Sequence, residues 1–194
     1  QNKADVLSRF ANDAQYQRLF QAAYPNQTDA VSLQNIILAI ASFQRSLVSA
    51  NSRYDQFLQK KAVLSDAQTR GMNLFFGEKA ECFHCHGSFN FNDQTIHAGS
   101  RIIETPFHNN GLYNLDGQGK YPEPNQGVFE LTGIPTDMGK FRAPSLRNVA
   151  VTAPYNHDGS VATLEEVVAN YAAGGRVITE GALAGDGRDR KSVV

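Results

Sequence analysis

The residues of this sequence that most clearly predict chemistry lie between Glu81 and Gly87. Within the run Glu-Cys-Phe-His-Cys-His-Gly, both cysteines of the chain fall close together and a histidine directly follows the second. Cys-x-x-Cys-His is the attachment motif of c-type haem, in which Cys82 and Cys85 form thioether bonds to the porphyrin. The short spacing brings the imidazole of His86 under the ring as the proximal iron ligand. The motif therefore predicts a covalently bound haem c.

Other uses of these residues fit the sequence less well. A zinc site needs four ligands, usually with a second pair of Cys or His, and the chain has no third cysteine. A redox dithiol of the thioredoxin kind opens a helix, whereas residues 88–93 do not resemble a helix start. A structural disulfide would leave His86 without a purpose. Haem attachment is thus the favoured interpretation, and it leaves no cysteine for a disulfide.

Length and charge limit the class of protein. With 194 residues the chain forms one large domain or a little more, and it can bury a core. Its net charge of −1 provides no electrostatic basis for binding nucleic acid or an acidic membrane surface. No apolar run approaches the roughly 20 residues of a membrane-spanning helix. We therefore expect no nucleic-acid partner and no membrane span.

The two ends of the sequence predict a processed or truncated chain. Residues 1–3 (Gln-Asn-Lys) are neither an initiator methionine nor a signal peptide, and residues 192–194 (Ser-Val-Val) resemble the start of an apolar element. Haem attachment requires reduced thiols on the exported side of a bacterial membrane. The haem motif alone therefore predicts a periplasmic location.

Apolar spacing predicts helices in the first third of the chain. One helical run ends at Pro25, another begins after Ser32, and a short third starts near Arg53. The second run carries the clearest apolar stripe, which consists of Leu33, Ile36, Ile37, Ile40, Phe43 and Leu47. We expect nearly all such apolar faces to lie in an ordinary core.

Two capping boxes predict helices nearer the motif. Ser65 and Gln68 begin a helix that leads directly to the cysteines, and Thr163 and Glu166 begin one that places Tyr171 on its inward face. Between residues 90 and 144, Gly, Pro, Asn and Asp are scattered without a helical period, which is typical of functional or packed loops. The expected fold is mainly α: a cytochrome c-like haem domain with long irregular loops.

The ligand opposite His86 decides whether the haem carries electrons or performs catalysis. Met138, which follows the loop region, is one candidate, and another histidine is a second. Tyr171 is a third, although tyrosine is an uncommon haem ligand and a buried tyrosine usually belongs to the core. Met72, on the helix before the motif, is expected in the core. The residues alone leave this choice open.

Two runs after the motif resemble a known family. Residues 141–159 (FRAPSLRNVAVTAPYNHDG) are similar to the bacterial di-haem cytochrome c peroxidase superfamily. In residues 164–176 (LEEVVANYAAGGR), Tyr171 stands where the electron-transfer peroxidases have their distal methionine, as in the MauG-type branch. Residues 108–117 and 137–142 are most similar to the MbnH enzymes associated with methanobactin clusters. In the family these motifs belong to the C-terminal haem domain.

The resemblance implies an oxidoreductase with a six-coordinate haem between His86 and Tyr171. A phenolate ligand would lower the potential and stabilise oxidised iron, so this haem would hold an oxidising equivalent. In MauG-type enzymes hydrogen peroxide reacts at a second, N-terminal haem, and the two haems share the oxidising equivalents. They then oxidise a residue of a partner protein, which is a tryptophan in the MbnH branch.

The resemblance also implies features that this chain lacks or leaves open. A calcium ion would be held partly by the main-chain carbonyls of Thr152 and Pro154, since carbonyl oxygens suit a hard cation. The chain has one Cys-x-x-Cys-His motif and no tryptophan, so the second haem would precede Gln1. We therefore interpret residues 1–64 as a helical segment leading from an N-terminal haem domain, and residues 65–194 as a C-terminal haem domain truncated at its end.

Two other functions remain alternatives. The chain could be the electron-transfer haem domain of an ordinary di-haem peroxidase, or a mono-haem cytochrome c with Met138 as the distal ligand. Among the remaining histidines, His157 is expected to tie a loop near the haem edge and His84 to face outward. His97 and His108 have no predicted role.

Overall fold

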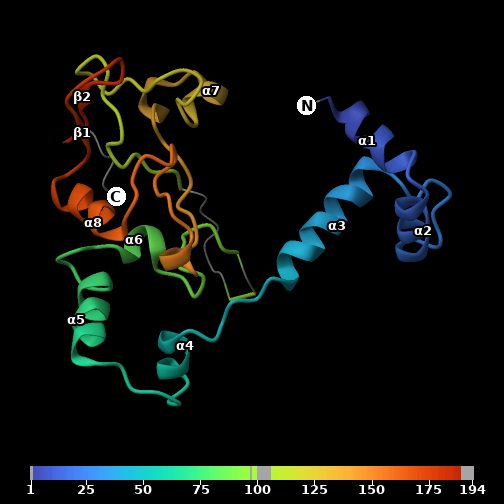
Figure 1. The fold of residues 1–194 in the computed structure, drawn as a ribbon, viewed down its shortest axis with the longest axis horizontal. Coiled ribbons are helices and arrows are strands. Elements are labelled where there is room, and N and C mark those ends of the chain that lie inside the picture. Colours follow the sequence, from blue (N-terminus) through green and yellow to red (C-terminus); the bar gives the residue numbers. More distant parts are fainter. Residues whose placement is uncertain (1, 97, 100–105, 189–194) are drawn as a thin grey trace. The chain divides into compact units, whose positions relative to one another are not determined.

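Helices supply most of the regular structure in the computed structural model, which describes residues 2–96, 98–99 and 106–188 (Figure 1). The chain divides into two units, Gln1–Asp55 and Gln56–Val194. Within the described residues the strands are limited to one two-stranded antiparallel pair, β1 (Val177–Ile178) and β2 (Gly185–Asp186). The expected mainly α, cytochrome c-like fold with long irregular loops is confirmed.

The first unit contains three helices that begin at side-chain caps. These are α1 (Lys3–Ala11), α2 (Ala14–Ala23) and α3 (Leu33–Ser46). The single helical run expected before Pro25 is divided in two, because the Asp13 carboxylate accepts hydrogen bonds from the first amides of α2. A small core forms around Phe20, Ala30 and Ile36.

The apolar stripe of α3 confirms the predicted helix but not its predicted burial. Ser32 caps the helix as expected, by accepting from the amide of Asn35. Ile36 is buried, whereas Ile37, Ile40, Phe43 and Leu47 are more than half exposed. The expectation of an ordinary core was therefore wrong for most of this face, because the small core of the unit reaches only the first turns of α3.

The second unit surrounds the haem motif with short helices joined by loops. The helices after α4 (Arg53–Leu58) are α5 (Asp66–Phe75), α6 (Phe83–His86), α7 (Phe129–Thr132) and α8 (Leu164–Ala172), with single turns η1 (Pro135–Asp137) and η2 (Val149–Val151). Both predicted capping boxes are present, Ser65 with Gln68 on α5 and Thr163 with Glu166 on α8. The sequence therefore correctly predicted the helix before the motif and the helix carrying Tyr171.

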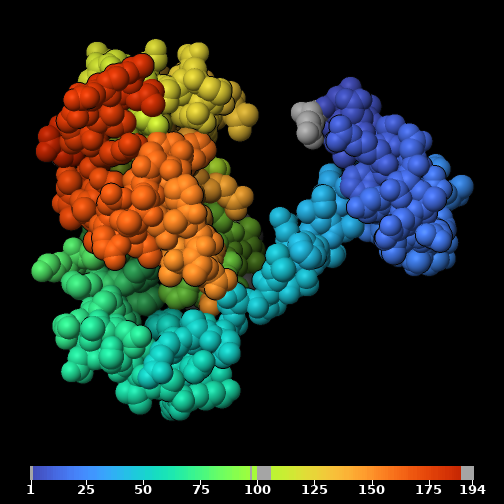
Figure 2. All heavy atoms as spheres, in the orientation of Figure 1, coloured from blue at the N-terminus to red at the C-terminus, as the bar shows by residue number. Residues whose placement is uncertain are grey.

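The loop region has a core of its own, formed by Leu112, Tyr113 and Tyr121. Its backbone is held by isolated bridges that join His108 to Phe141 and residue 127 to residue 140. Gly139 adopts φ +70°, and a Cβ there would lie 2.2 Å from the Tyr121 ring, so the close approach requires glycine. In the space-filling view, the segment near residues 150–165 (orange) lies against the last described segment (red) (Figure 2).

No helix within the described residues is long and apolar enough to cross a membrane.

Candidate haem site

The cysteine motif lies on α6, a single helical turn that follows α5 (Figure 1). Glu81 adopts φ +50°, which turns the chain sharply just before Cys82. The amide of His86 then donates to the Cys82 carbonyl at 3.0 Å, which closes the turn. Both thiols are free and partly exposed. One turn of helix thus presents the two thiols and the imidazole together.

The orientation of His86 is fixed by a main-chain oxygen. Its Nδ1 lies 3.0 Å from the Phe91 carbonyl oxygen, and because a carbonyl can only accept, Nδ1 carries the proton. Burial lowers the pKa of His86, while hydrogen bonds with the backbone at Phe91 and Pro144 oppose that shift. The imidazole is therefore neutral, with Nε2 as the basic nitrogen available to a metal.

A later segment of the chain, residues 145–147, holds the Phe91 carbonyl in place. The Leu146 amide donates to this same carbonyl at 3.3 Å, and the Ser145 hydroxyl donates to the Asn90 carbonyl at 2.6 Å. The Arg147 guanidinium donates to the Phe89 carbonyl at 2.5 Å and lies 5.3 Å from the centre of the Phe91 ring. We call residues 145–147 the strap, since they restrain the loop that orients His86.

Tyr171 projects from α8, and Figure 1 shows this helix beside α6. The residue is 51 % exposed, yet burial of its hydroxyl end is the main cause that raises its pKa. A hydrogen bond with the Asn110 side chain acts to lower it, and Cys85 and Cys82 act to raise it. The phenol therefore lies within electrostatic range of both thiols.

Tyr171 is one of the residues that line a small pocket. The lining residues are Asn110, Leu112, Asn156, Val167, Asn170, Tyr171 and Arg176. They come from α8, the segment after it and two loops, so segments distant in the sequence meet here. The assignment of Tyr171 as the distal ligand remains a prediction that this arrangement supports.

The two methionines have different surroundings. Met138 packs against the Leu112, Tyr113 and Tyr121 cluster, and its carbonyl accepts from the Asn109 side chain at 3.0 Å. Met72, which was expected in the core, is only partly buried on α5. The structure thus gives Met138 a packing role in the loop core.

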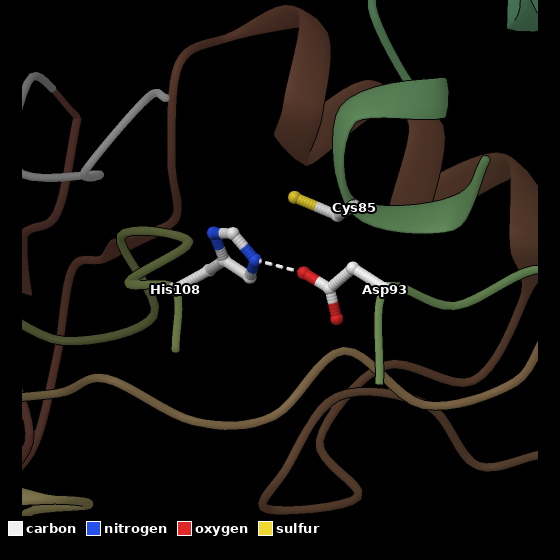
Figure 3. A group of neighbouring side chains, drawn as sticks. All are labelled: Cys85, Asp93 and His108. Carbon is white, nitrogen blue, oxygen red and sulfur yellow. Dashed lines mark hydrogen bonds and ion pairs between the residues drawn. The ribbon is translucent and has the colours of Figure 1, made fainter. Parts of the chain in front are cut away.

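Sequence reasoning missed a cluster beside the motif. One ligand atom each of Cys85, Asp93 and His108 lies within 4.8 Å of the others (Figure 3). His108 Nε2 and Asp93 Oδ2 are hydrogen-bonded, and burial, assisted by Asp93 and Cys82, raises the pKa of Cys85 to about 11. No local sequence pattern predicts the contact between Asp93 and His108, because the two residues are fifteen positions apart.

The other histidines lie apart from these groups or outside the described residues. His157 stacks on Phe141 with ring centres 3.9 Å apart, and its Nε2 lies 3.4 Å from the Asn125 amide oxygen. These contacts link two loops, which agrees with the predicted loop-tying role, and the position of His157 near the haem edge stays a prediction. His84 is exposed and faces outward, also as predicted. His97 lies outside the described residues.

Thr152 and Pro154, the predicted calcium ligands, are exposed in the turn after η2. The Thr152 hydroxyl donates to the Val149 carbonyl at 3.2 Å. Among the described residues, the candidate metal-binding cluster of His, Cys and acidic side chains lies elsewhere, at Cys85. The calcium site therefore remains a prediction based on the resemblance.

The residues around α6 fit a covalent haem by the chemistry of their donors. Cys82 and Cys85 present thiols from one helical turn, and His86 presents a neutral imidazole whose second nitrogen is already bonded. A mainly helical unit with this motif defines a c-type haem domain.

Comparison with known proteins supports this class. A family model described as di-haem cytochrome c peroxidase matches residues 1–63. The cytochrome-c peroxidase IdrP1 of Denitromonas iodatirespirans is 36 % identical over 178 residues, which cover 84 % of this chain and 45 % of that protein. The methylamine utilization protein MauG of Methylophilus methylotrophus is 33 % identical over 170 residues, covering 87 % of this chain and 45 % of that protein.

A solved structure is also similar. The crystal structure of a MauG-like protein associated with microbial copper homeostasis superposes with a TM-score of 0.86 at 58 % identity, covering 97 % of this chain and 54 % of that chain. The chain belongs to the di-haem cytochrome c peroxidase family, and the family implies haem c. The chain spans less than half the length of these two curated relatives.

Proposed function

We propose that this chain is the C-terminal haem c domain of a periplasmic di-haem oxidoreductase of the MauG/MbnH-like kind. In this proposal the whole enzyme stores oxidising equivalents from hydrogen peroxide and uses them to oxidise a residue of a partner protein, a tryptophan in the MbnH-like case. The similarity to MauG proteins and to a MauG-like structure at 58 % identity supports this assignment.

Each proposed ligand has a distinct task. A haem bound here supplies an iron centre that gives up and accepts electrons. Cys82 and Cys85 anchor the porphyrin, and His86 offers Nε2 while Phe91 holds the proton on Nδ1. Tyr171 offers a phenol oxygen, which is a hard donor that favours ferric iron once it has lost its proton.

The observation that carries the proposal is the similarity to a MauG-like protein structure, at 58 % identity over 97 % of this chain. Tyr171 fits the ligand assignment, because Cys85 and Cys82 act on the pKa of its phenol. Met138, the alternative ligand, packs instead in the loop core with Tyr113 and Tyr121. Burial raises the pKa of Tyr171, so the phenol keeps its proton until a cation offsets that shift. Ferric iron has the charge to do so, and a histidine–phenolate pair stabilises oxidised iron.

The remaining parts of the proposal concern the longer protein. In this proposal residues 1–64 are a helical segment leading from an N-terminal haem domain, and residues 65–194 are the C-terminal haem domain. A second haem c would then lie in the preceding domain and react with peroxide. A calcium ion would bind the carbonyls of Thr152 and Pro154.

The test uses the full-length holoenzyme and its spectrum. We expect the ferric protein to lack the near-infrared band of methionine ligation and to respond to hydrogen peroxide at the haem bands. Tyr171→Phe should change the ferric spectrum of one haem and abolish oxidation of the partner protein, whereas Tyr16→Phe, at an exposed site, should change neither. An unchanged ferric spectrum in Tyr171→Phe would contradict the ligand assignment.

A second candidate function is that of an ordinary peroxidase that accepts electrons from a small cytochrome. It is favoured by the peroxidase IdrP1, which matches this chain at least as well as MauG does. The two candidates differ in their reductant. Rapid peroxide turnover with a reduced small cytochrome c, without oxidation of any protein residue, would favour the peroxidase.

A further inference from the structure

Two buried tyrosines lie in contact within the loop core. Tyr113 is 5 % exposed and Tyr121 is 1 % exposed, and their ring centres are 5.5 Å apart in an edge-to-face arrangement. The two side chains share the same apolar cluster, but their hydroxyl groups have different partners. The two tyrosines therefore differ in whether a neighbouring group can take up the hydroxyl proton.

The Tyr113 hydroxyl donates to a carboxylate. Its oxygen lies 2.5 Å from Asp158 Oδ2, and Asp158 in turn accepts from Arg176 Nη1 at 3.1 Å and from the Ser160 hydroxyl at 2.6 Å. The Asp158 side chain is only 15 % exposed, although the residue as a whole lies at the surface. The Ser160 amide also donates to Asp158 Oδ1 at 3.1 Å, so three further donors hold the carboxylate against the phenol.

The protonation states of this pair are well separated. Burial and the adjacent Asp158 raise the pKa of Tyr113 to about 12. Burial alone would raise the pKa of Asp158, but hydrogen bonds from Ser160 and Tyr113 and the charge of Arg176 hold it below its usual value. At neutral pH the pair is thus a protonated phenol that donates to a charged base.

The Tyr121 hydroxyl has no such base among its hydrogen-bond partners. It donates to the Asn109 amide oxygen at 2.7 Å and accepts from the Leu112 amide at 3.0 Å. Burial raises the pKa of Tyr121 as well. An amide oxygen accepts a hydrogen bond but does not take up a proton near neutral pH. Tyr121 is therefore a matched control within the same cluster.

The hydrogen-bonded pair of Tyr113 and Asp158 lies next to the pocket that Tyr171 lines. Arg176, which binds Asp158, lines this pocket together with Tyr171 and Leu112, and Leu112 directly precedes Tyr113 in the chain. The carboxylate that accepts from Tyr113 is thus linked through one guanidinium to the wall of the candidate haem site.

We propose that Tyr113 is a redox site that stores one oxidising equivalent within the protein, with Asp158 as its proton acceptor. The proposal rests on the proposed function, which supplies hydrogen peroxide as the oxidant. Reduction of peroxide to two waters consumes two electrons and two protons. The protons would come from solvent. Tyr113 would supply one of the electrons through the haem centre and the haems would supply the other, which would leave the haems one electron short.

The step balances in atoms and charge at the tyrosine. When Tyr113 loses an electron, its O–H bond breaks, the proton passes to Asp158 Oδ2, and a neutral phenoxyl radical remains beside a neutral carboxylic acid. A reductant such as the partner residue returns the electron, and the proton moves back to the phenol oxygen. Because the phenol is protonated at rest, its oxidation requires this base. Tyr121 has only an amide at the same position and stays reduced.

The test is freeze-quench electron paramagnetic resonance of the full-length holoenzyme after hydrogen peroxide, without a partner protein. We expect a radical signal that narrows when tyrosine is ring-deuterated and is lost in Tyr113→Phe but kept in Tyr121→Phe. Asp158→Asn should also lose it, although Tyr113 is present, because an amide cannot accept the proton. A purely structural role for the Tyr113–Asp158 bond would produce no radical that depends on either residue.

The outcomes separate this inference from the proposed function. If the haem bands do not respond to peroxide, the proposed function fails and this inference fails with it. If the bands respond but no tyrosine radical forms, or the radical survives Tyr113→Phe, only this inference is overturned. Should Tyr113→Phe fail to fold, the deuterated unmodified enzyme and Asp158→Asn still decide the question.

Discussion

The two candidate ligands of the iron are held in different ways. His86 is oriented by the Phe91 carbonyl, which is itself restrained by the strap, so its geometry is set before any metal binds. Tyr171 is half exposed, and a hydrogen bond with Asn110 is the side-chain contact that acts on its phenol. The proximal side is thus preorganised by the protein, whereas the distal side depends on the metal to complete it.

This difference has a consequence for redox chemistry. An imidazole fixed in this way would keep a bound haem in place through changes of oxidation state. A phenol that must lose its proton to bind responds to the charge on the iron, since a more oxidised centre favours the phenolate. The distal ligand would therefore stabilise stored oxidising equivalents, while the proximal ligand stays the same.

The variant with the largest expected effect removes the proposed proximal ligand, His86. His86→Ala lacks that imidazole, so we expect little covalently bound haem at this motif. His84→Ala is the matched control, because His84 lies on the same turn of helix but is exposed. Haem content per chain, measured by the pyridine haemochrome assay, compares the two. Equal haem content in both variants would contradict the assignment of His86.

Replacement of the distal ligand should have the next largest effect. In Tyr171→Phe the haem stays attached through Cys82, Cys85 and His86, but the anionic donor is lost, so ferric iron is less stabilised. We expect the reduction potential of this haem to rise by on the order of 100 mV, since axial ligands tune haem potentials over a range of about 0.8 V. Spectroelectrochemical titration measures the change, and an unaltered potential would assign the distal position to another group.

The strap provides a smaller and more selective test of the proximal side. Arg147→Gln removes a donor to the Phe89 carbonyl and the cation above the Phe91 ring, which loosens the carbonyl that polarises His86. A weaker Nδ1 hydrogen bond makes the imidazole a poorer donor, so we expect the potential to rise by about 40 mV, equivalent to about 1 kcal/mol.

Arg142→Gln is the control for this prediction. Arg142 lies shortly before the strap, is exposed and donates to the side chain of Gln94. Its replacement should leave the potential unchanged. If both variants shift the potential equally, the effect arises from the lost positive charge and not from the strap.

The contrast between the two sides also shows what the sequence could predict. Contacts within a few residues were predictable: the Ser65 and Thr163 capping boxes, the helix before the motif, and the helix with Tyr171. They were predictable because each depends on side-chain types at a fixed spacing along one element. These local patterns also placed the mainly α fold correctly.

Contacts between distant segments were not predictable in this way. The Phe91 carbonyl reaches His86 because Phe91 adopts φ +52° and a strap more than fifty residues later binds its loop. The Asp93–His108 and Tyr113–Asp158 pairs join loops that have no periodic pattern. The exposure of the α3 face could not be predicted either, since a stripe of apolar residues does not reveal what covers it.

The smallest expected effect concerns the helix that carries the distal ligand. Thr163→Ala removes the side chain that caps α8, and we expect it to cost about 1 kcal/mol of stability. Ser65→Ala removes the corresponding cap of α5, at a similar expected cost. Thermal unfolding of the two holo variants measures both losses.

The two cap variants should differ in how they affect the haem. Because Tyr171 is carried by α8 and is 51 % exposed, fraying of α8 should reduce the fraction of ferric haem with a phenolate ligand. His86 is held by Phe91 and the strap, so an equal loss of stability at α5 should leave its coordination intact. The phenolate charge-transfer absorption, followed with temperature below the unfolding transition, distinguishes these cases. Parallel loss in both variants would show that the distal ligand is as firmly preorganised as the proximal one.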